Sequence, residues 1–351
     1  MYSLETESIL KILGFATFSF LIAIVWTPAL TKFLVKIKAG KQIRDSGDTP
    51  IFSNLHQKKL GTPTMGGILI WGTVLFVILV SAALAYLFPQ YFEKFNFLSR
   101  SQTVLPLGIL IFSALVGLFD DLFGIWHIGP NGGGLRMRHR IILYTLIAIV
   151  GAWWFYFKLD WDVFHIPFLG DFSIGFWYVP IFIFVVVATA FSVNETDGLD
   201  GLAGGTMLIA FLSYIVIAFN SGKYDLAIFN AVVAGSLLAF LWFNIYPARF
   251  FMGDTGAMSL GVTLGVMAML TNSALLLPLF GSIFVLESLS VLVQVASKKW
   301  RGKKIFLSAP IHHHFEALGW PETKVTMRFW IVAGVFAMLG LIIALLDRNF
   351  F

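Results

Sequence analysis

The sequence contains no cysteine, and only 12% of its 351 residues are charged. The lack of cysteine excludes disulfides and thiolate metal sites, although it says little about compartment. A soluble domain is about 45–50% apolar and about 25% charged, whereas this chain is 58% hydrophobic. A soluble fold of this size has too much surface to hide so many apolar side chains. The composition therefore predicts a membrane protein.

Several common motifs are also absent. The Gly-rich stretch Asn131–Gly134 is not followed by Gly-Lys-Ser/Thr, which favours a flexible turn over a phosphate loop. No His-Glu-x-x-His spacing occurs, so zinc is the weaker choice of metal. Glu5 and Glu7 precede the first apolar run, where a signal peptide would carry Lys or Arg. We therefore expect no cleavable signal peptide.

Long apolar runs recur along the chain, and a membrane-spanning helix needs about 20 such residues. The runs are continuous rather than alternating, which argues against a transmembrane β-barrel. We predict an all-α polytopic membrane protein, with one transmembrane domain over residues 1–351 and ten spans. The spans run from Ile12 to Val35, Met65 to Phe88, Val104 to Phe123, Ile141 to Phe157, Phe176 to Val193, Leu202 to Phe219, Ala227 to Phe243, Ala257 to Leu270, Leu275 to Ala296 and Val325 to Leu346.

Lys and Arg collect in alternate loops between these spans. The odd-numbered loops carry Lys36, Lys38, Lys41, Arg44, Lys58, Lys59, Arg136, Arg138, Arg140, Arg249, Lys298, Lys299, Arg301, Lys303, Lys304 and Lys324. The even-numbered loops and the C-terminus hold only Lys94, Arg100, Lys158, Lys223 and Arg348. The positive-inside rule therefore makes the odd loops cytoplasmic and places both termini on the outer, periplasmic or extracellular side.

Polar side chains that a lipid-facing helix does not need also fall in or beside the odd-numbered loops. They are Lys59, Thr62, Thr64, Asp120, Asp121, Asn194, Asp197, Asp200, Asn244, Asp254, His312, His313 and His314. Each group alone has a plainer explanation, such as a solvated helix end, an Asx-rich turn or a helix N-cap. Together they favour one cytoplasmic active site, because carboxylates at membrane depth are costly and mark functional sites.

This set of side chains suits phosphoryl transfer. Mg²⁺ prefers oxygen ligands and commonly bridges protein carboxylates to substrate phosphates. The reaction also needs cationic groups beside the metal, and Lys59, Arg138, Arg140 or the histidines would supply them. The residues alone therefore predict metal-dependent phosphoryl chemistry on a lipid at the cytoplasmic face.

Six segments, in order, then give a more specific resemblance. They are Lys58-Lys-Leu-Gly-Thr-Pro-Thr-Met-Gly-Gly67, Asp120-Asp121, Asn194-Glu-Thr-Asp-Gly-Leu-Asp-Gly-Leu-Ala203, Phe251-Met-Gly-Asp254, Ala309-Pro-Ile-His-His-His-Phe-Glu316 and Gly319-Trp-Pro-Glu322. From Leu34 to Arg348 the chain resembles the MraY family of phospho-MurNAc-pentapeptide translocases, within the polyprenyl-phosphate N-acetylhexosamine 1-phosphate transferases. The internal His run points to that family rather than to the wider superfamily.

The resemblance implies an enzyme of the bacterial inner membrane in peptidoglycan synthesis. It would transfer phospho-MurNAc-pentapeptide from UDP-MurNAc-pentapeptide to undecaprenyl phosphate, giving lipid I and UMP with Mg²⁺ as cofactor. It also implies a homodimer, and we expect no nucleic-acid partner.

Residue roles follow from the same motifs. Asp254 matches the aspartate that binds Mg²⁺, with Asp120 and Asp197 nearby, and Asp120 matches the favoured base. Asp121 would tune the charge of the pair. The remaining matches, which line the nucleotide, sugar and diphosphate regions, are Lys59, Thr64, Asn194, Asp197, Gly198, Leu199, Asp200, Asn244, Phe251, Gln294 and His312–His314. Phe251 would stack on uracil, since a flat base favours an aromatic face.

Two departures from the family pattern stand out. Arg140 aligns with a position that usually carries lysine, and a guanidinium is not equivalent to an ammonium. The first loop also looks longer than usual around Asp48–Asn54.

Two other functions remain open at this stage. A related transferase acting on UDP-GlcNAc would share the carboxylates, although the His run argues against it. A secondary transporter would place its charged site near the midplane of broken helices, whereas these residues cluster at one face. The sequence leaves open whether the transfer takes one step or proceeds through a covalent Asp254 intermediate.

Overall fold

A computed structural model describes residues 4–40, 59, 61–99, 102–129 and 133–350. Several features of the sequence lie outside this part of the chain: Lys41, Arg44, Lys58, Arg100, the segment Asp48–Asn54 and the start of the Asn131–Gly134 turn.

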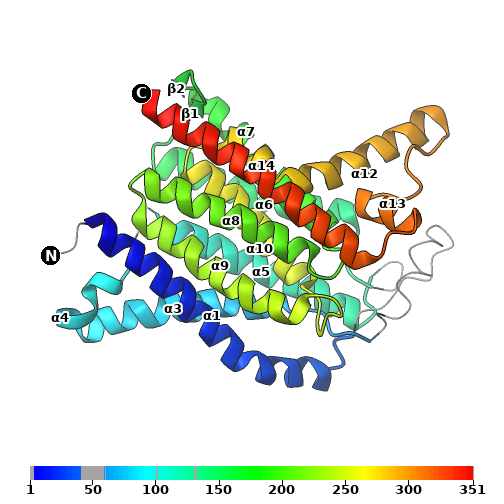
Figure 1. Cartoon of the computed structure of the whole chain (residues 1–351), viewed down its shortest axis with the longest axis horizontal. Helices are drawn as coiled ribbons and strands as arrows, with labels where there is room; N and C mark the ends of the chain where they lie inside the picture. The colour runs from blue at the N-terminus through cyan, green and yellow to red at the C-terminus, as the bar shows by residue number, and fades with distance from the viewer. Residues whose placement is uncertain (1–3, 41–58, 60, 100–101, 130–132, 351) are drawn as a thin grey trace.

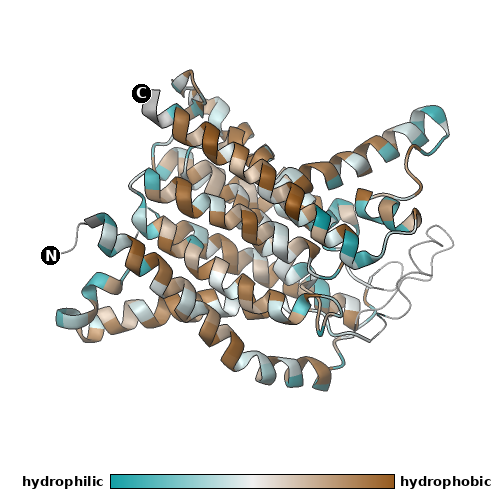
Figure 2. Cartoon of the chain, viewed as in Figure 1, coloured by the Kyte–Doolittle hydropathy of each residue, from teal (hydrophilic) through white to brown (hydrophobic). Residues whose placement is uncertain are grey.

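Within the described residues, nine helices are long and apolar enough to cross a membrane, and ten if one bent pair counts as a single span. The prediction of an all-α polytopic membrane protein is therefore confirmed (Figures 1 and 2). The nine are α1 (Leu4–Lys36), α3 (Gly67–Leu87), α5 (Val104–Ile125), α6 (Met137–Lys158), α7 (Tyr178–Thr196), α8 (Leu202–Asn220), α9 (Tyr224–Asn244), α10 (Gly253–Leu270) and α14 (Glu322–Phe350).

The bent pair is where the structure differs from the ninth predicted span, which was drawn as one helix from Leu275 to Ala296. The chain instead forms η5 (Ala274–Leu276) and α11 (Leu277–Phe280), breaks at Gly281, and continues at an angle of 86° as α12 (Ser282–Arg301). The buried side of α12 is largely polar and includes Glu287 and Gln294. Its exposed side carries Leu286, Leu289, Leu292 and Val293. This distribution suits a helix with its apolar face outward, and Figure 1 shows α12 extending away from the bundle.

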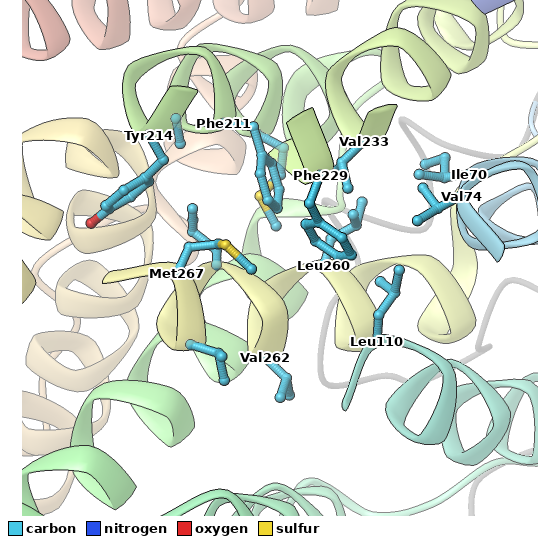
Figure 3. Close-up of a cluster of buried hydrophobic side chains, with 14 of the residues drawn as sticks. Ile70, Val74, Leu110, Phe211, Tyr214, Phe229, Val233, Leu260, Val262 and Met267 are labelled. Carbon is cyan, nitrogen blue, oxygen red and sulfur yellow. The ribbon is translucent and has the colours of Figure 1, made fainter. Parts of the chain in front are cut away.

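The core forms around α10, whose residues from Thr255 to Leu270 are all buried. α10 packs mainly against α5 and α7, while α9 packs against α1 and α8. A Cβ on Gly261 would lie only 2.8 Å from the Cα of Ala190 in α7, so the missing side chain permits this close approach. Small residues at such contacts are typical of membrane helices. Figure 3 shows Leu260 and Met267 among the aromatic side chains of neighbouring helices.

The shorter elements mark the two ends of the bundle. The hairpin of β1 (Val163–Ile166) and β2 (Gly170–Ser173) pairs antiparallel, with Val163 opposite Ser173. In Figure 1 this hairpin and both chain termini lie at one end, and α13 (Ile311–Ala317) lies at the other. The remaining short helices are α4 (Pro89–Phe92), η2 (Glu93–Phe95) and η4 (Gly175–Trp177). The predicted site residues belong to the end that holds α13.

Candidate active site

A guanidinium joins three polar side chains that the sequence placed on separate segments. Arg140, near the start of α6, has its Nε 2.7 Å from Oδ2 of Asp120 at the end of α5. Its Nη2 donates to Oδ2 of Asp254 at 2.7 Å, and its Nη1 donates to Oδ1 of Asn194 at 3.1 Å. The ends of α5 and α7 and the starts of α6 and α10 therefore meet at Arg140.

The oxygens of this cluster are not equally accessible. Asp254 keeps 20% of its side chain exposed, whereas Asp120 keeps 4%. The second oxygen of Asp254 accepts a hydrogen bond from Nδ2 of Asn194 at 2.7 Å. Oδ1 of Asp120 accepts from the backbone N–H of Leu135 at 2.5 Å, but its buried Oδ2 accepts no hydrogen bond among the described residues, because Arg140 faces it without hydrogen-bond alignment. Asp254 is thus the carboxylate most open to a ligand, whereas Oδ2 of Asp120 is buried in an ion pair with Arg140.

Asp121 accepts hydrogen bonds from the backbone of α10. Its two oxygens accept the N–H groups of Asp254 at 3.1 Å and Thr255 at 2.9 Å. These donors have no partner within the helix at its first turn, so Asp121 caps α10 from another helix. A Cβ on Gly253 would lie 2.7 Å from Oδ2 of Asp121 and 2.8 Å from Oγ1 of Thr64, so a glycine is required there. Asp121 therefore fixes the position of Asp254 rather than facing the cluster.

The donor atoms of the cluster fit a hard cation in kind. Asp120, Asn194 and Asp254 offer carboxylate and amide oxygens, which Mg²⁺ prefers. Among the residues that the structure describes, however, no three His, Asp or Glu side chains surround one point as metal ligands would. The cluster offers only two carboxylates, Asp120 and Asp254, both contacted by Arg140, because Asp121 directs its oxygens to the backbone of α10. Asp254 and Asn194 are the side chains that would hold the metal, with Asp120 beside them.

A second cationic centre lies next to the first. Nζ of Lys59 contacts Oδ1 of Asp200 at 2.7 Å and Oε1 of Glu322 at 2.5 Å, and it lies 5.6 Å from the ring centre of Phe251. The same Glu322 oxygen accepts the backbone N–H of Asp200 at 2.6 Å. The side chain of Asn244 accepts from Gly201 N–H at 3.0 Å and so fixes the loop that follows Asp200. Lys59, Asp200 and Glu322 therefore form one hydrogen-bonded group, with Phe251 beside Lys59 and Asn244 bonded to the next residue of the loop.

His312 is the histidine of the run that reaches this region. Its ring is buried, its Nδ1 lies 3.0 Å from Oε2 of Glu287 in α12, and a Cβ on Gly198 would lie 2.2 Å from its Nε2. Burial lowers the pKa of His312, but the negative charges of Glu287, Glu316 and Glu195 raise it by more, so its pKa lies above the usual value. Gly198 is needed because any side chain there would displace the imidazole.

Other predicted residues are not brought into these clusters. The amide of Gln294 bonds only to the backbone of Ile305 and Phe306, so in the described contacts it orders its own loop. Nδ1 of His314 accepts the N–H of Leu307. Three others lie as follows: His313 pairs with Glu316 at 2.7 Å, Leu199 is buried in a small apolar cluster, and Arg138 is exposed beside His139. Asp197 directly follows the end of α7.

Two acidic residues of the site had no role in the sequence analysis. Glu322 belongs to the Gly319–Glu322 motif, but nothing in its spacing indicates contact with Lys59. Glu287 lies in an apolar run, and it is fully buried. A carboxylate inside a membrane-spanning pattern is itself a signal of function, and this signal would have identified Glu287.

Comparison with known proteins gives consistent matches. The model of the Glycosyl transferase family 4 matches residues 103–272. A phospho-N-acetylmuramoyl-pentapeptide-transferase of Geobacillus sp. (strain WCH70) is 42% identical over 93% of this chain and 95% of its own length. Proteins of the same name from Chloroflexus aggregans and Bacillus subtilis (strain 168) are 36% and 38% identical, over 97% and 92% of this chain and 91% and 95% of their own lengths.

Proposed function

The chain belongs to the phospho-N-acetylmuramoyl-pentapeptide-transferase family, and from that premise we propose how it carries out the family reaction. It transfers phospho-MurNAc-pentapeptide from UDP-MurNAc-pentapeptide to undecaprenyl phosphate, and the products are lipid I and UMP. The observation that carries our assignment of the site is the meeting of Asp120, Asn194 and Asp254 around Arg140.

Asp120 is the base in this proposal. Its buried Oδ2 takes the proton from the phosphate of the lipid acceptor. The deprotonated phosphate oxygen then attacks the β-phosphorus of the UDP moiety in line with the leaving group. A bond forms between that oxygen and the β-phosphorus, the bond from the β-phosphorus to the bridging oxygen breaks, and UMP leaves with the electron pair. Oδ2 of Asp120 supports this role because no described group donates to it in hydrogen-bond geometry, and its contact to Nε of Arg140 is an ion pair.

The nucleotide half of the donor binds in the group around Lys59. The ring of Phe251 provides a face for uracil, and Lys59 and Asp200 supply a donor and an acceptor beside it. Phe251 is only three residues from Asp254, so a nucleotide in this group directs its diphosphate toward the carboxylate cluster. The short separation of the two groups supports a single donor site.

We propose that the reaction depends on Mg²⁺. A bound Mg²⁺ would neutralise charge on the diphosphate oxygens and the leaving group. Asp254 supports this assignment because it is the most exposed carboxylate of the cluster and lies in the first turn of α10, where the helix dipole favours negative charge. We favour direct transfer over a covalent intermediate, since metal ligation would occupy Asp254.

We also propose the setting of the enzyme. Its active site faces the cytoplasm from the bacterial inner membrane, as the charge distribution of the loops supports. The family resemblance supports a homodimer.

The site assignment is tested by UMP release from detergent-purified protein with both substrates and Mg²⁺. We expect Asp254→Asn to lower turnover by at least about 100-fold. The metal that would stabilise negative charge in the transition state would lose its carboxylate ligand. Asp171→Asn, in β2 at the opposite end with 63% of its side chain exposed, is the matched control. If the two variants had equal activity, the assignment of the active site to this cluster would be wrong.

A further inference from the structure

We infer that Arg140 is an exchangeable internal cation, which a divalent metal must displace from Asp254 when it binds. This inference rests on the metal dependence proposed above. It adds a role for a residue that departs from the lysine usual at this position.

The contacts of Arg140 carry the first step. Its three guanidinium nitrogens are directed at Asp120, Asn194 and Asp254, which are the side chains that provide oxygens for a metal. Its Nη2 donates a hydrogen bond to Oδ2 of Asp254 at 2.7 Å, and Nδ2 of Asn194 donates one to Oδ1 of Asp254. Each oxygen of Asp254 therefore already accepts one hydrogen bond, and a metal at this carboxylate would have to share Oδ2 with the guanidinium or displace it.

Electrostatics carries the second step. Asp120 and Asp254 both face the guanidinium, which balances part of their negative charge in a site with little solvent. A divalent cation at the same oxygens would place two positive charges beside the positive charge of Arg140. Like charges at this range repel strongly. Exchange avoids that repulsion, whereas binding beside an unmoved Arg140 does not.

The geometry also indicates how Arg140 leaves. Its contact to Asp120 is an ion pair without hydrogen-bond alignment, so one of the three anchors constrains direction weakly. The side chain keeps 17% of its surface exposed, which gives it a path toward the open side of the cluster. Displacement would release Oδ2 of Asp120 from the positive charge, and the arrival of the metal would then also free the base.

A lysine at this position would act differently. An ammonium is a point charge on a flexible stem and cannot bond three separate groups in the plane of a guanidinium. We therefore expect this enzyme to bind divalent metal more weakly than a variant with lysine at position 140.

The test is Mn²⁺ binding to the purified full-length protein without substrate, measured by calorimetry and by the rise in melting temperature with MnCl₂. We expect Arg140→Gln to tighten the dissociation constant about tenfold or more, since a charge-assisted hydrogen bond no longer competes. Arg140→Lys should give a smaller gain and keeps a positive charge for folding. Arg136→Gln, with the same charge change at the exposed N-cap position of α6, should bind as the wild type does.

The exchange also predicts a pattern in stability. Arg140→Gln should melt below the wild type without metal and gain more from Mn²⁺, because a ligand stabilises the folded state in proportion to its affinity. A dissociation constant unchanged or weaker in both variants would overturn the exchange and leave the proposed reaction standing. Absence of Mn²⁺ binding in every variant would overturn both the exchange and the metal dependence. Lipid-dependent UMP release in the presence of a chelator would show independently that the reaction does not depend on a metal.

Discussion

Nζ of Lys59 and Oε1 of Glu322 lie 2.5 Å apart, although 263 residues separate them in the chain. Glu322 begins α14 and also accepts the N–H of Asp200. One carboxylate therefore fixes both Lys59 and Asp200, the donor and the acceptor proposed to lie beside the uracil. The remaining exposed fraction of the Lys59 side chain is 15%, which leaves its ammonium little freedom to choose another partner.

This relationship predicts a binding defect for Glu322→Gln. The neutral amide keeps the shape but loses the charge that orients Lys59, so we expect the Michaelis constant for the UDP donor to rise about tenfold, as for the loss of a charge-assisted hydrogen bond. Turnover at saturation should change by less than about threefold, because the residue does not contact the reacting atoms. Steady-state kinetics with both parameters measured tests this.

Glu7→Gln is the control for that experiment, since Glu7 pairs with Lys11 at the other end of the bundle. A Glu322→Gln enzyme with an unchanged Michaelis constant and a reduced turnover would contradict a positioning role.

Asp121 predicts a different outcome from Asp254. Because both of its oxygens serve the backbone of α10, Asp121→Asn should cost about 1–2 kcal/mol of stability, as for the loss of a helix cap. Activity at low temperature should fall far less than in Asp254→Asn. Thermal melts and UMP release measured on the same preparations check this. A fully inactive Asp121→Asn with a wild-type melting temperature would instead make Asp121 catalytic.

Gly198 should not tolerate alanine. The added Cβ would lie 2.2 Å from Nε2 of His312, and that ring is held by Glu287. We expect Gly198→Ala to lower activity about tenfold or more, by analogy with overpacking costs of about 1–3 kcal/mol. Gly14→Ala in α1, where nothing lies within 4 Å, is the control.

A double-mutant cycle strengthens that test. The effect of Gly198→Ala on the melting temperature should shrink in a His312→Ala background, because residues in contact are not additive. Equal effects in both backgrounds would show that the alanine acts on the backbone and not on the imidazole.

The ion pair of His312 and Glu287 predicts a dependence of stability on pH. The pKa of His312 is raised in the folded protein: burial lowers it, but the carboxylates of Glu287, Glu316 and Glu195 together raise it by more. Its stabilising contribution is therefore fully present below the unfolded pKa of about 6.5 and is lost as pH rises through the folded value. Glu287→Gln should melt well below the wild type near pH 6, by about 3 kcal/mol for a broken buried pair, and the gap should narrow at higher pH.

Melting curves of both proteins between about pH 6 and pH 9 give this comparison from below to above the unfolded pKa of about 6.5. Glu93→Gln, an exposed carboxylate at the other end, should follow the wild type at every pH. A gap that widens as pH rises would reverse the sign of the argument.

Much of the fold was predictable because a bilayer imposes a minimum length of apolar helix on every span. The convergence of Asp120, Asn194 and Asp254 was predictable for a related reason, since alternate loops must lie on one side. The break at Gly281 was not, because hydropathy counts apolar residues without showing which way they face.

The partners of the charged residues were the other part that the sequence did not predict. The sequence places Arg140 in the same loop region as the aspartates. It cannot show that the guanidinium contacts both Asp120 and Asp254. Gln294 was matched to the substrate side, yet its described hydrogen bonds go to its own loop. Such assignments depend on distances of a few ångströms, and the spacing of residues along the chain does not specify them.

The central claim is that this chain makes lipid I from UDP-MurNAc-pentapeptide. The most direct measurement is UMP release by the wild-type protein with Mg²⁺, comparing UDP-MurNAc-pentapeptide with UDP-GlcNAc, each with and without undecaprenyl phosphate. We predict release only with the pentapeptide donor and only with the lipid. Release from UDP-GlcNAc, or none from folded protein given both proper substrates, would contradict the assignment.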